Sequence, residues 1–569
     1  LFALDAEADG LFHRRLNLGL HLCEVFRPDQ VLSNSEIDKT GDGVSPPPLV
    51  DLFVVPVLDR VGHGVALEAI GNCFEEHRPV TRPDPVDRLF GRLAHRHDVH
   101  AVHLHGRDVV GVGVDAGNGS ATTLVKVEGV AAVAKVTGKI GVTDGAISIT
   151  DASSTSLTAA GTITTVSVNE FGGGATINSG ALTSITIDGT GSTVNAGTSG
   201  ALTTATATTM ALNLAGTTST GAVTLDSDIT TVNIASATAA NTLASLSSSG
   251  ATAVNISGSQ NLVLTANTFA ATAAITSTST GNVTLGTAVA VGQTYTGGSG
   301  VDTLTTTTAS TKATTLGGGN DVITSDGIYG TGGSLDAGAG DDTIVMTAAQ
   351  AAAATASTTF AGKVSGLETL SVGATAAATA LNMTNADGMN TVTSAGFGAA
   401  LTITNAAAGF TFNQTVLGSV ASSIALTTAT GTSDTVNLGY SATTGFSNTA
   451  AITIAGVENI NITTNDTLTT VGAVFGAEIT AASAVTVTVS GDAGFNATGL
   501  TSTKLTTFDA SGVTATGAGG AVTLTTGVLA ASATLTGGAG TNTISAAAVT
   551  SLTKVMTITG GAGLDNLIG

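Results

Sequence analysis

The chain has 569 residues and a formal net charge of −22, with 40 acidic residues against 18 basic ones. This balance argues against a nucleic-acid-binding protein, because neutralising phosphates requires Lys and Arg. No apolar run is long enough to span a membrane, and no secretory signal peptide is visible at the N-terminus. We therefore expect no nucleic acid among its partners and no membrane span.

Composition changes abruptly near residue 113. All 8 Pro, both Cys, all 9 His and every Arg lie at or before Arg107. Residues 114–569 contain seven Lys against 23 acids and are dominated by Thr, Ala, Gly and Ser. We place a boundary here. Residues 1–113 form a poorly defined N-terminal segment, and residues 114–569 form a body large enough to bury a substantial core.

The segment 1–113 has three interpretations. It is a misread reading frame or otherwise non-native, or a small domain, or a metal site. The third rests on the histidines between His95 and His105, since alternate histidines on a strand can bind zinc or copper. Their spacing matches no metal motif known to us. Cys23 and Cys73 can pair, but two cysteines here indicate nothing about the redox compartment.

Residues 114–295 are predicted to form a Thr/Ser/Ala-rich β-solenoid. Short β-branched runs alternate at period two and recur about every 18–25 residues, with almost no helix signal. The alternation and the positive mean hydropathy argue against disorder. The clearest predicted strands, including two further along the chain, are 182–188, 229–234, 251–256, 262–265, 452–454 and 485–489.

Residues 296–346 are predicted to be a calcium-binding RTX-like β-roll. The pattern Gly-Gly-x-Gly-x-Asp-x-apolar occurs at 297–304 and, with another residue in place of the first Gly, at 316–323 and 337–344. Glycines allow the tight turn, and their carbonyls together with the Asp carboxylate are oxygen ligands that suit Ca²⁺. The predicted ligands are Asp302, Asp321, Asp342, Gly298, Gly300, Gly317, Gly319, Gly338 and Gly340.

The spacing of these copies predicts a row of carboxylates. The copies start 19 and 21 residues apart, about one full coil each, so the three Asp residues should stack on one edge. Coils lie about 4.8 Å apart, and charges at that distance repel by about 3–4 kcal/mol at an effective dielectric near 20. Such a row requires a cation. The alternative is a set of ordinary glycine turns.

The apolar position of the motif should enter the core. It is held by Leu304, Ile323, Ile344, Ile544 and Leu567.

Residues 347–535 are predicted to continue the solenoid, and residues 536–569 to form a second, truncated RTX-like region. The phrase at 364–372 returns at 454–462, as expected for equivalent coils. In the last region the motif occurs at 537–544, with Asn542 in place of Asp, and at 560–567. The predicted calcium ligands there are Asp565, Gly561 and Gly563.

The fold class that follows is all-β: a parallel β-solenoid or β-roll with calcium-binding Gly-rich turns, preceded by a poorly defined segment. Residues 114–569 contain no His, Cys, Arg or Trp. Catalysis requires a nucleophile, a base or paired acids in a suitable site. We therefore expect that the protein is not an enzyme, and that its cofactor is Ca²⁺.

From about Gly117 to Gly569, about four fifths of its length, the chain resembles a Caulobacter-type bacterial surface-layer protein with RTX-like calcium-binding repeats. The Thr/Ala/Gly/Ser bias, the repeats and the phrases at 179–187 and 430–438 carry this resemblance. It implies type I secretion through a C-terminal signal, anchoring to lipopolysaccharide through an N-terminal helical domain, and a calcium-dependent lattice. Residues 1–113 do not look like that anchor domain, and the chain stops inside a repeat, so we expect both anchor and secretion signal to be missing.

We therefore expect a structural surface-layer protein that self-associates into a lattice on the bacterial cell exterior. The alternative is a calcium-dependent secreted adhesin or the RTX appendage of an exported enzyme, because such modules also carry these repeats. An ordered sheet after calcium addition would favour the lattice protein, and dispersed rods the adhesin.

Overall fold

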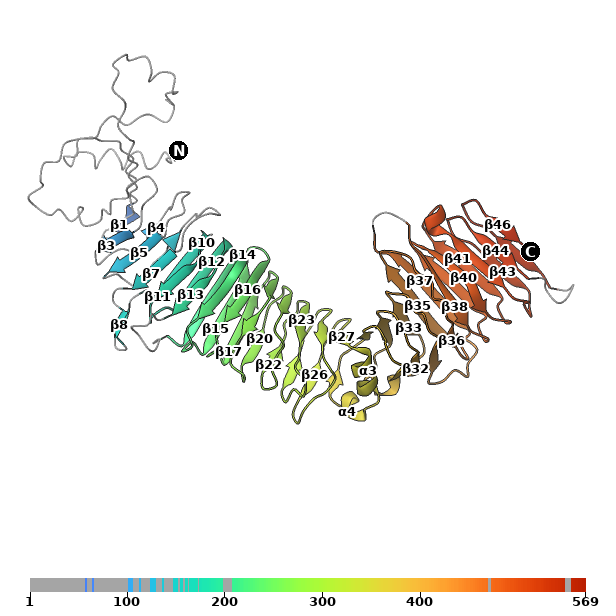
Figure 1. Cartoon of the computed structure of the whole chain (residues 1–569), viewed down its shortest axis with the longest axis horizontal. Helices are drawn as coiled ribbons and strands as arrows, with labels where there is room; N and C mark the ends of the chain where they lie inside the picture. Colours follow the sequence, from blue (N-terminus) through green and yellow to red (C-terminus); the bar gives the residue numbers. More distant parts are fainter. Residues whose placement is uncertain are drawn as a thin grey trace, which may run out of the picture. The chain divides into compact units, whose positions relative to one another are not determined.

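The computed structural model describes residues 163–171, 173–197, 207–468, 472–547 and 554–569, together with short segments between residues 57 and 161. Strands account for 52% of the described residues and helices for 5%, and the strands form a parallel β-solenoid (Figure 1). The predicted all-β, parallel β-solenoid fold is therefore confirmed. The chain divides into two compact units, Leu1–Ala207 and Thr208–Gly569.

In the first unit, most strand pairs are parallel. Strand β3 pairs with β5 across the boundary expected at residue 113, so residues 101–105 share a sheet with the body. The predicted His cluster is only partly described: His103 and His105 belong to β3, and the others lie outside the described residues. The strands are β1 (Val57–Leu58), β2 (Gly64–Val65), β3 (Ala101–His105), β4 (Val112–Gly113), β5 (Thr123–Glu128), β6 (Val136–Thr137), β7 (Ile147–Asp151), β8 (Ser154–Ser156), β9 (Ala159–Ala160), β10 (Thr165–Phe171), β11 (Ala175–Asn178), β12 (Ser184–Gly191) and β13 (Val194–Gly197).

The second unit begins with the long strand β14 (Thr209–Leu225), which pairs with β15 and then with β16. Successive strands of the following coils then belong in turn to one of two parallel stacks (Figure 1). The first stack contains β15 (Thr231–Ala237), β17 (Ala253–Gly258), β20 (Ala274–Ser277), β22 (Thr294–Thr296), β24 (Ala313–Thr315), β26 (Ser334–Asp336) and β28 (Val364–Ser365).

The second stack carries the first three predicted calcium motifs, each at the start of one of its strands. It contains β16 (Asn241–Ser247), β18 (Leu262–Leu264), β19 (Asn267–Thr268), β21 (Val283–Leu285), β23 (Asp302–Thr305), β25 (Val322–Thr324), β27 (Thr343–Met346), β29 (Thr369–Val372), β31 (Thr391–Ser394), β33 (Phe410–Gln414), β35 (Thr435–Ala442), β37 (Asn459–Asp466), β39 (Thr486–Gly491), β41 (Thr507–Val513), β43 (Ala533–Thr536) and β45 (Met556–Thr559).

The third stack takes over from the first after the helical insertion described below. It contains β30 (Thr379–Asn382), β32 (Leu401–Ala406), β34 (Ser422–Leu426), β36 (Ile452–Ile454), β38 (Val474–Thr480), β40 (Gly494–Thr501), β42 (Val522–Thr526), β44 (Thr543–Ala546) and β46 (Asn566–Ile568). The 3₁₀ turns η1 (Met383–Asn385) and η2 (Ala518–Gly520) complete this part.

Inward side chains form continuous apolar columns along the stacks. The apolar position of the motif belongs to one of them, which runs without interruption through Leu304, Ile323, Ile344, Leu370, Val392, Phe412, Leu438, Ile462 and Val489. All of these side chains are at most 3% exposed. Burying each contributes roughly 1.5–3 kcal/mol, so the period of the motif also sets the period of the core.

The predicted strands overlap those of the structure, and helix is scarce, as expected. The helices at one place were not predicted. Helices α3 (Ala348–Thr355) and α4 (Thr358–Ala361) interrupt the continuation expected from residue 347. Alanine has the highest helix propensity, and Thr347 and Gln350 form a capping box at the start of α3. In the described part of the chain, no helix has the length and apolar character needed to cross a membrane.

Candidate metal centre

The strand register stacks the three predicted acids. Thr303 pairs with Val322, and Val322 pairs with Thr343, so the preceding residues Asp302, Asp321 and Asp342 follow one another along one edge. The Asp302 N–H donates to Asp321 Oδ1 at 2.6 Å, and the Asp321 N–H donates to Asp342 Oδ1 at 2.7 Å. The predicted stacking is therefore confirmed. We call this row the acid column.

A fourth acid, Glu368, completes the column and was not predicted from the sequence. The Asp342 N–H donates to Glu368 Oε2 at 2.7 Å, and Glu368 is half-buried. Glu458 makes the same contact with the Asp434 N–H at 3.2 Å. Both glutamates lie at the same place in the phrase that repeats at 364–372 and 454–462. That repetition was the signal that could have identified them.

One oxygen of each aspartate in the column is buried without a hydrogen-bond partner. Asp302, Asp321 and Asp342 are 1%, 0% and 0% exposed, and their Oδ2 atoms make no hydrogen bond. A buried polar group without a partner costs about 1–3 kcal/mol, and more if it is charged. Three such oxygens in one column are acceptors that a cation could satisfy.

The electrostatics agree with this conclusion. Burial, augmented by the neighbouring Asp321, raises the pKa of Asp302 to about 7, although the nearby Tyr295 hydroxyl and the Gly298 N–H partly offset the rise. The Tyr295 hydroxyl makes no hydrogen bond of good geometry, so its effect reflects proximity. Burial likewise raises the pKa of Asp321 to about 6 and, less strongly, raises that of Asp342.

Asp466 shows how the same chain stabilises an aspartate with backbone donors alone. Its Oδ1 accepts from the Leu468 N–H at 3.0 Å, and its Oδ2 accepts from the N–H groups of Gly472 and Ala473 at 3.1 Å each. These hydrogen bonds lower its pKa. Because both of its oxygens have donors, Asp466 needs no cation, and the acid column differs from it in this respect.

The predicted glycines stack in two columns beside the acids. A Cβ atom on Gly317 or Gly338 would overlap the carbonyl oxygen of the equivalent glycine one coil earlier, Gly298 or Gly317. Gly319 and Gly340 stand in the same relation to Gly300 and Gly319. Gly317 and Gly338 also have φ of 98° and 94°, which disfavours other residues. Only glycine therefore fits both the conformation and the spacing.

The residues present fit Ca²⁺. Each coil supplies a buried carboxylate oxygen without a donor next to closely stacked glycine backbone, and Ca²⁺ takes six to eight such oxygens. Across the described ranges, no group of three or more His, Cys, Asp or Glu side chains is placed to hold one metal ion. A cation at this edge would therefore depend on glycine carbonyls for much of its coordination.

The C-terminal pair of motifs lies on a different turn, leading into β44 and β46 of the third stack. Asp565 is half-buried, and its neighbour along the stack is Asn542, not another acid. Gly561 and Gly563 stack against Gly538 and Gly540. Ile544 is fully buried, whereas Leu567 is 43% exposed, contrary to the prediction that it enters the core. Leu567 lies in β46, the last strand of its stack.

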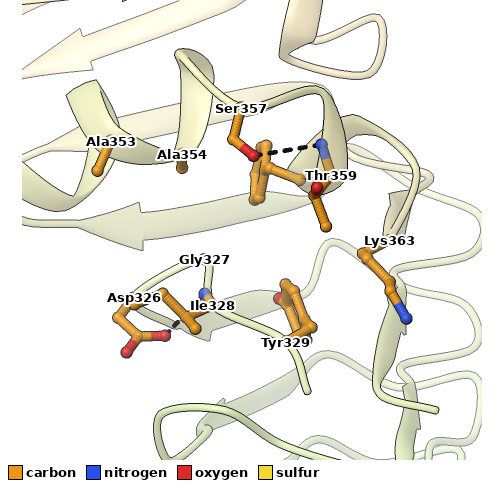
Figure 2. Close-up of a pocket in the computed structure, with 10 residues that line it drawn as sticks. Asp326, Gly327, Ile328, Tyr329, Ala353, Ala354, Ser357, Thr359 and Lys363 are labelled. Carbon is orange, nitrogen blue, oxygen red and sulfur yellow. Dashed lines mark hydrogen bonds between the residues drawn. The ribbon is translucent and has the colours of Figure 1, made fainter. Parts of the chain in front are cut away.

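A separate hollow of about 230 Å³ lies beside α3 and α4, lined in part by Tyr329, Phe360 and Lys363 (Figure 2). Several of its polar groups already bind one another. The Ile328 N–H donates to Asp326 Oδ1 at 2.9 Å, and the Thr359 N–H donates to the Ser357 hydroxyl. Burial raises the pKa of Tyr329 to about 12, so its hydroxyl stays neutral. These polar contacts do not single out a ligand.

No protein-family model matches the chain, and no curated protein matches it either.

Proposed function

We propose that the protein is a calcium-dependent structural component of a bacterial surface layer, secreted to the cell exterior and self-associating into a lattice. The observation that supports the metal is the row of three buried Oδ2 atoms without donors. Asp302, Asp321 and Asp342 would hold Ca²⁺ together with glycine carbonyls of the same turns. Bound calcium would neutralise the carboxylates and cross-link successive coils.

The structural role and the location rest on the composition and the resemblance. The body is acidic, lacks His, Cys, Arg and Trp, and is built from stacked coils. Such a body has a repetitive surface and few side chains of the kinds used in catalysis. Both properties are consistent with a protein that assembles with copies of itself. Lipopolysaccharide anchoring belongs to this proposal only through the family resemblance.

Calorimetric titration of the full chain with Ca²⁺ tests the metal. We expect binding that Asp321→Ala weakens, because the middle acid faces both neighbours in the column. Asp509→Ala, which removes a half-exposed acid of β41, is the matched control and should bind as the wild type does. Equal affinities in all three proteins would refute the assignment.

Electron microscopy before and after calcium addition tests the assembly. An ordered two-dimensional sheet is the expected result. Dispersed particles that bind calcium without ordering would instead support the secreted adhesin or appendage.

A further inference from the structure

We infer that the Asn542 carboxamide takes the place of a cation, so that the C-terminal Gly-rich turn closes without calcium while the acid column depends on it. The statement about Asn542 rests on its own hydrogen bonds. The contrast with the acid column rests on the proposed function.

Asn542 is fully buried, and both ends of its carboxamide have partners in the turn. Its Nδ2 donates to the carbonyls of Gly538 and Gly540 at 3.0 and 2.9 Å, and to Asp565 Oδ1 at 2.7 Å. Its Oδ1 accepts from the Gly538 N–H at 3.1 Å. The positively polarised N–H groups of one carboxamide therefore join two glycine carbonyls and the carboxylate of the following coil.

The same place in the acid column holds a carboxylate oxygen. Gly537 and Gly297 open equivalent motifs, and a Cβ added to either would meet the sixth residue of its motif. At Gly537 it meets the Asn542 carboxamide, including Nδ2, and at Gly297 it meets Asp302 Oδ2. Asp302 Oδ2 thus lies where Asn542 has a donor, yet it is itself an acceptor without a partner.

This difference of one atom determines what each turn needs. An amide NH₂ supplies two donors, whereas an ionised carboxylate only accepts. With Asn542, the two amide hydrogens are shared among the two glycine carbonyls and Asp565 Oδ1, and Asp565 Oδ1 also accepts from the Asn542 backbone N–H at 3.1 Å. No second carboxylate repels Asp565. With Asp at that position, the same oxygens would face another negative oxygen, and a proton or cation would have to intervene.

Two lysines allow the two regions to be probed separately in the full chain. Lys312 is exposed and lies between Asp302 and Asp321, whereas Lys554 is half-exposed and lies between Asn542 and Asp565. Trypsin cleaves after lysine, and in a folded chain the rate follows local opening. Cleavage at each lysine therefore reports the stability of its own pair of coils.

In the wild type, we expect a chelator to accelerate cleavage at Lys312 by about tenfold or more and to leave cleavage at Lys554 unchanged. A tenfold acceleration corresponds to a loss of about 1.4 kcal/mol in the free energy of local opening. Asn542→Asp should make cleavage at Lys554 chelator-sensitive and add one bound calcium by calorimetry. Asn566→Asp is the matched control, because it adds the same charge at an exposed position in β46. It should do neither.

The reciprocal variant keeps the inference testable if Asn542→Asp folds poorly. Asp321→Asn should make Lys312 less sensitive to chelator, because the new amide supplies donors to the turn. Lys554 cleavage that depends on calcium in the wild type, or an Asn542→Asp protein that gains no calcium, would overturn the inference. A wild type that binds no calcium at all would refute the proposed function, while the gain expected of Asn542→Asp would still test the role of Asn542.

Discussion

Removing calcium at neutral pH should destabilise the chain, and acidification should restore most of the loss. Burial raises the pKa of Asp302 from 3.8 to about 7. A tenfold change in proton affinity corresponds to about 1.4 kcal/mol, so ionising Asp302 costs about 4 kcal/mol more in the folded chain than in the unfolded chain. Asp321, with a pKa of about 6, adds to this in the same direction.

The sign follows from which state holds the protons. Between about pH 4 and pH 7 the folded chain keeps a proton on Asp302 that the unfolded chain has released, so stability in a chelator falls as the pH rises through this range. Below about pH 4 both states are protonated and the penalty disappears. Bound calcium favours the ionised carboxylates and should remove the decline.

Melting temperatures by circular dichroism, in chelator and in excess calcium from about pH 4 to pH 7.5, test this reasoning. We expect the two curves to meet at low pH and to diverge by several degrees at neutral pH. Asp321→Asn should reduce the divergence. A melting temperature in chelator that stays level or rises with pH would refute the reasoning, as would a calcium effect of equal size at both ends of the range.

Three further predictions concern the turns around the column. Gly338→Ala should lower the free energy of unfolding, measured by urea titration, by about 1–3 kcal/mol or more. The reason is that the new Cβ meets backbone of the preceding coil at a residue with positive φ. The control is Gly527→Ala, whose Cβ meets nothing within 4 Å and which should be nearly neutral. Glu368→Ala should lower the free energy of unfolding by about 1–3 kcal/mol, because it leaves the Asp342 N–H without an acceptor. Glu368→Gln keeps an acceptor and should retain most of that stability. Equal losses in the two variants would contradict this role of Glu368. Asp466→Ala should lower the melting temperature equally with calcium and with chelator, since its partners are backbone donors; a calcium-dependent loss would count against that assignment.

The features that follow from periodicity could be read from the sequence. A motif that recurs once per coil fixes which residues stack, so the positions of Asp302, Asp321 and Asp342 and the buried Leu304, Ile323 and Ile344 were predictable. Parallel register repeats the same contact coil after coil. The repeat length of the motif is therefore sufficient to predict which residues, about 20 positions apart in the chain, stack on one another in successive coils.

Features that break the period were not predicted. The run of alanines in α3 belongs to a body rich in Ala throughout, and only the pairing of Thr347 with Gln350 distinguishes it as a helix start. This insertion separates Glu368 from Asp342 by 26 residues, more than the 19 and 21 between the aspartates, so the fourth acid fell outside the expected spacing. The role of Asn542 depends on the positions of individual donors and acceptors, which a motif does not specify.

The hydrogen bonds of the acid column all point the same way along the chain. Each aspartate N–H donates to the acid of the following coil, from Asp302 to Asp321, from Asp321 to Asp342, and from Asp342 to Glu368. A chain that emerges N-terminus first therefore always presents one open N–H at its growing end. That N–H can form its hydrogen bond only after the next coil has folded, and Glu368 belongs to the last coil of the column. The hydrogen bonds of the column therefore form in the same order in which their residues follow one another from the N-terminus.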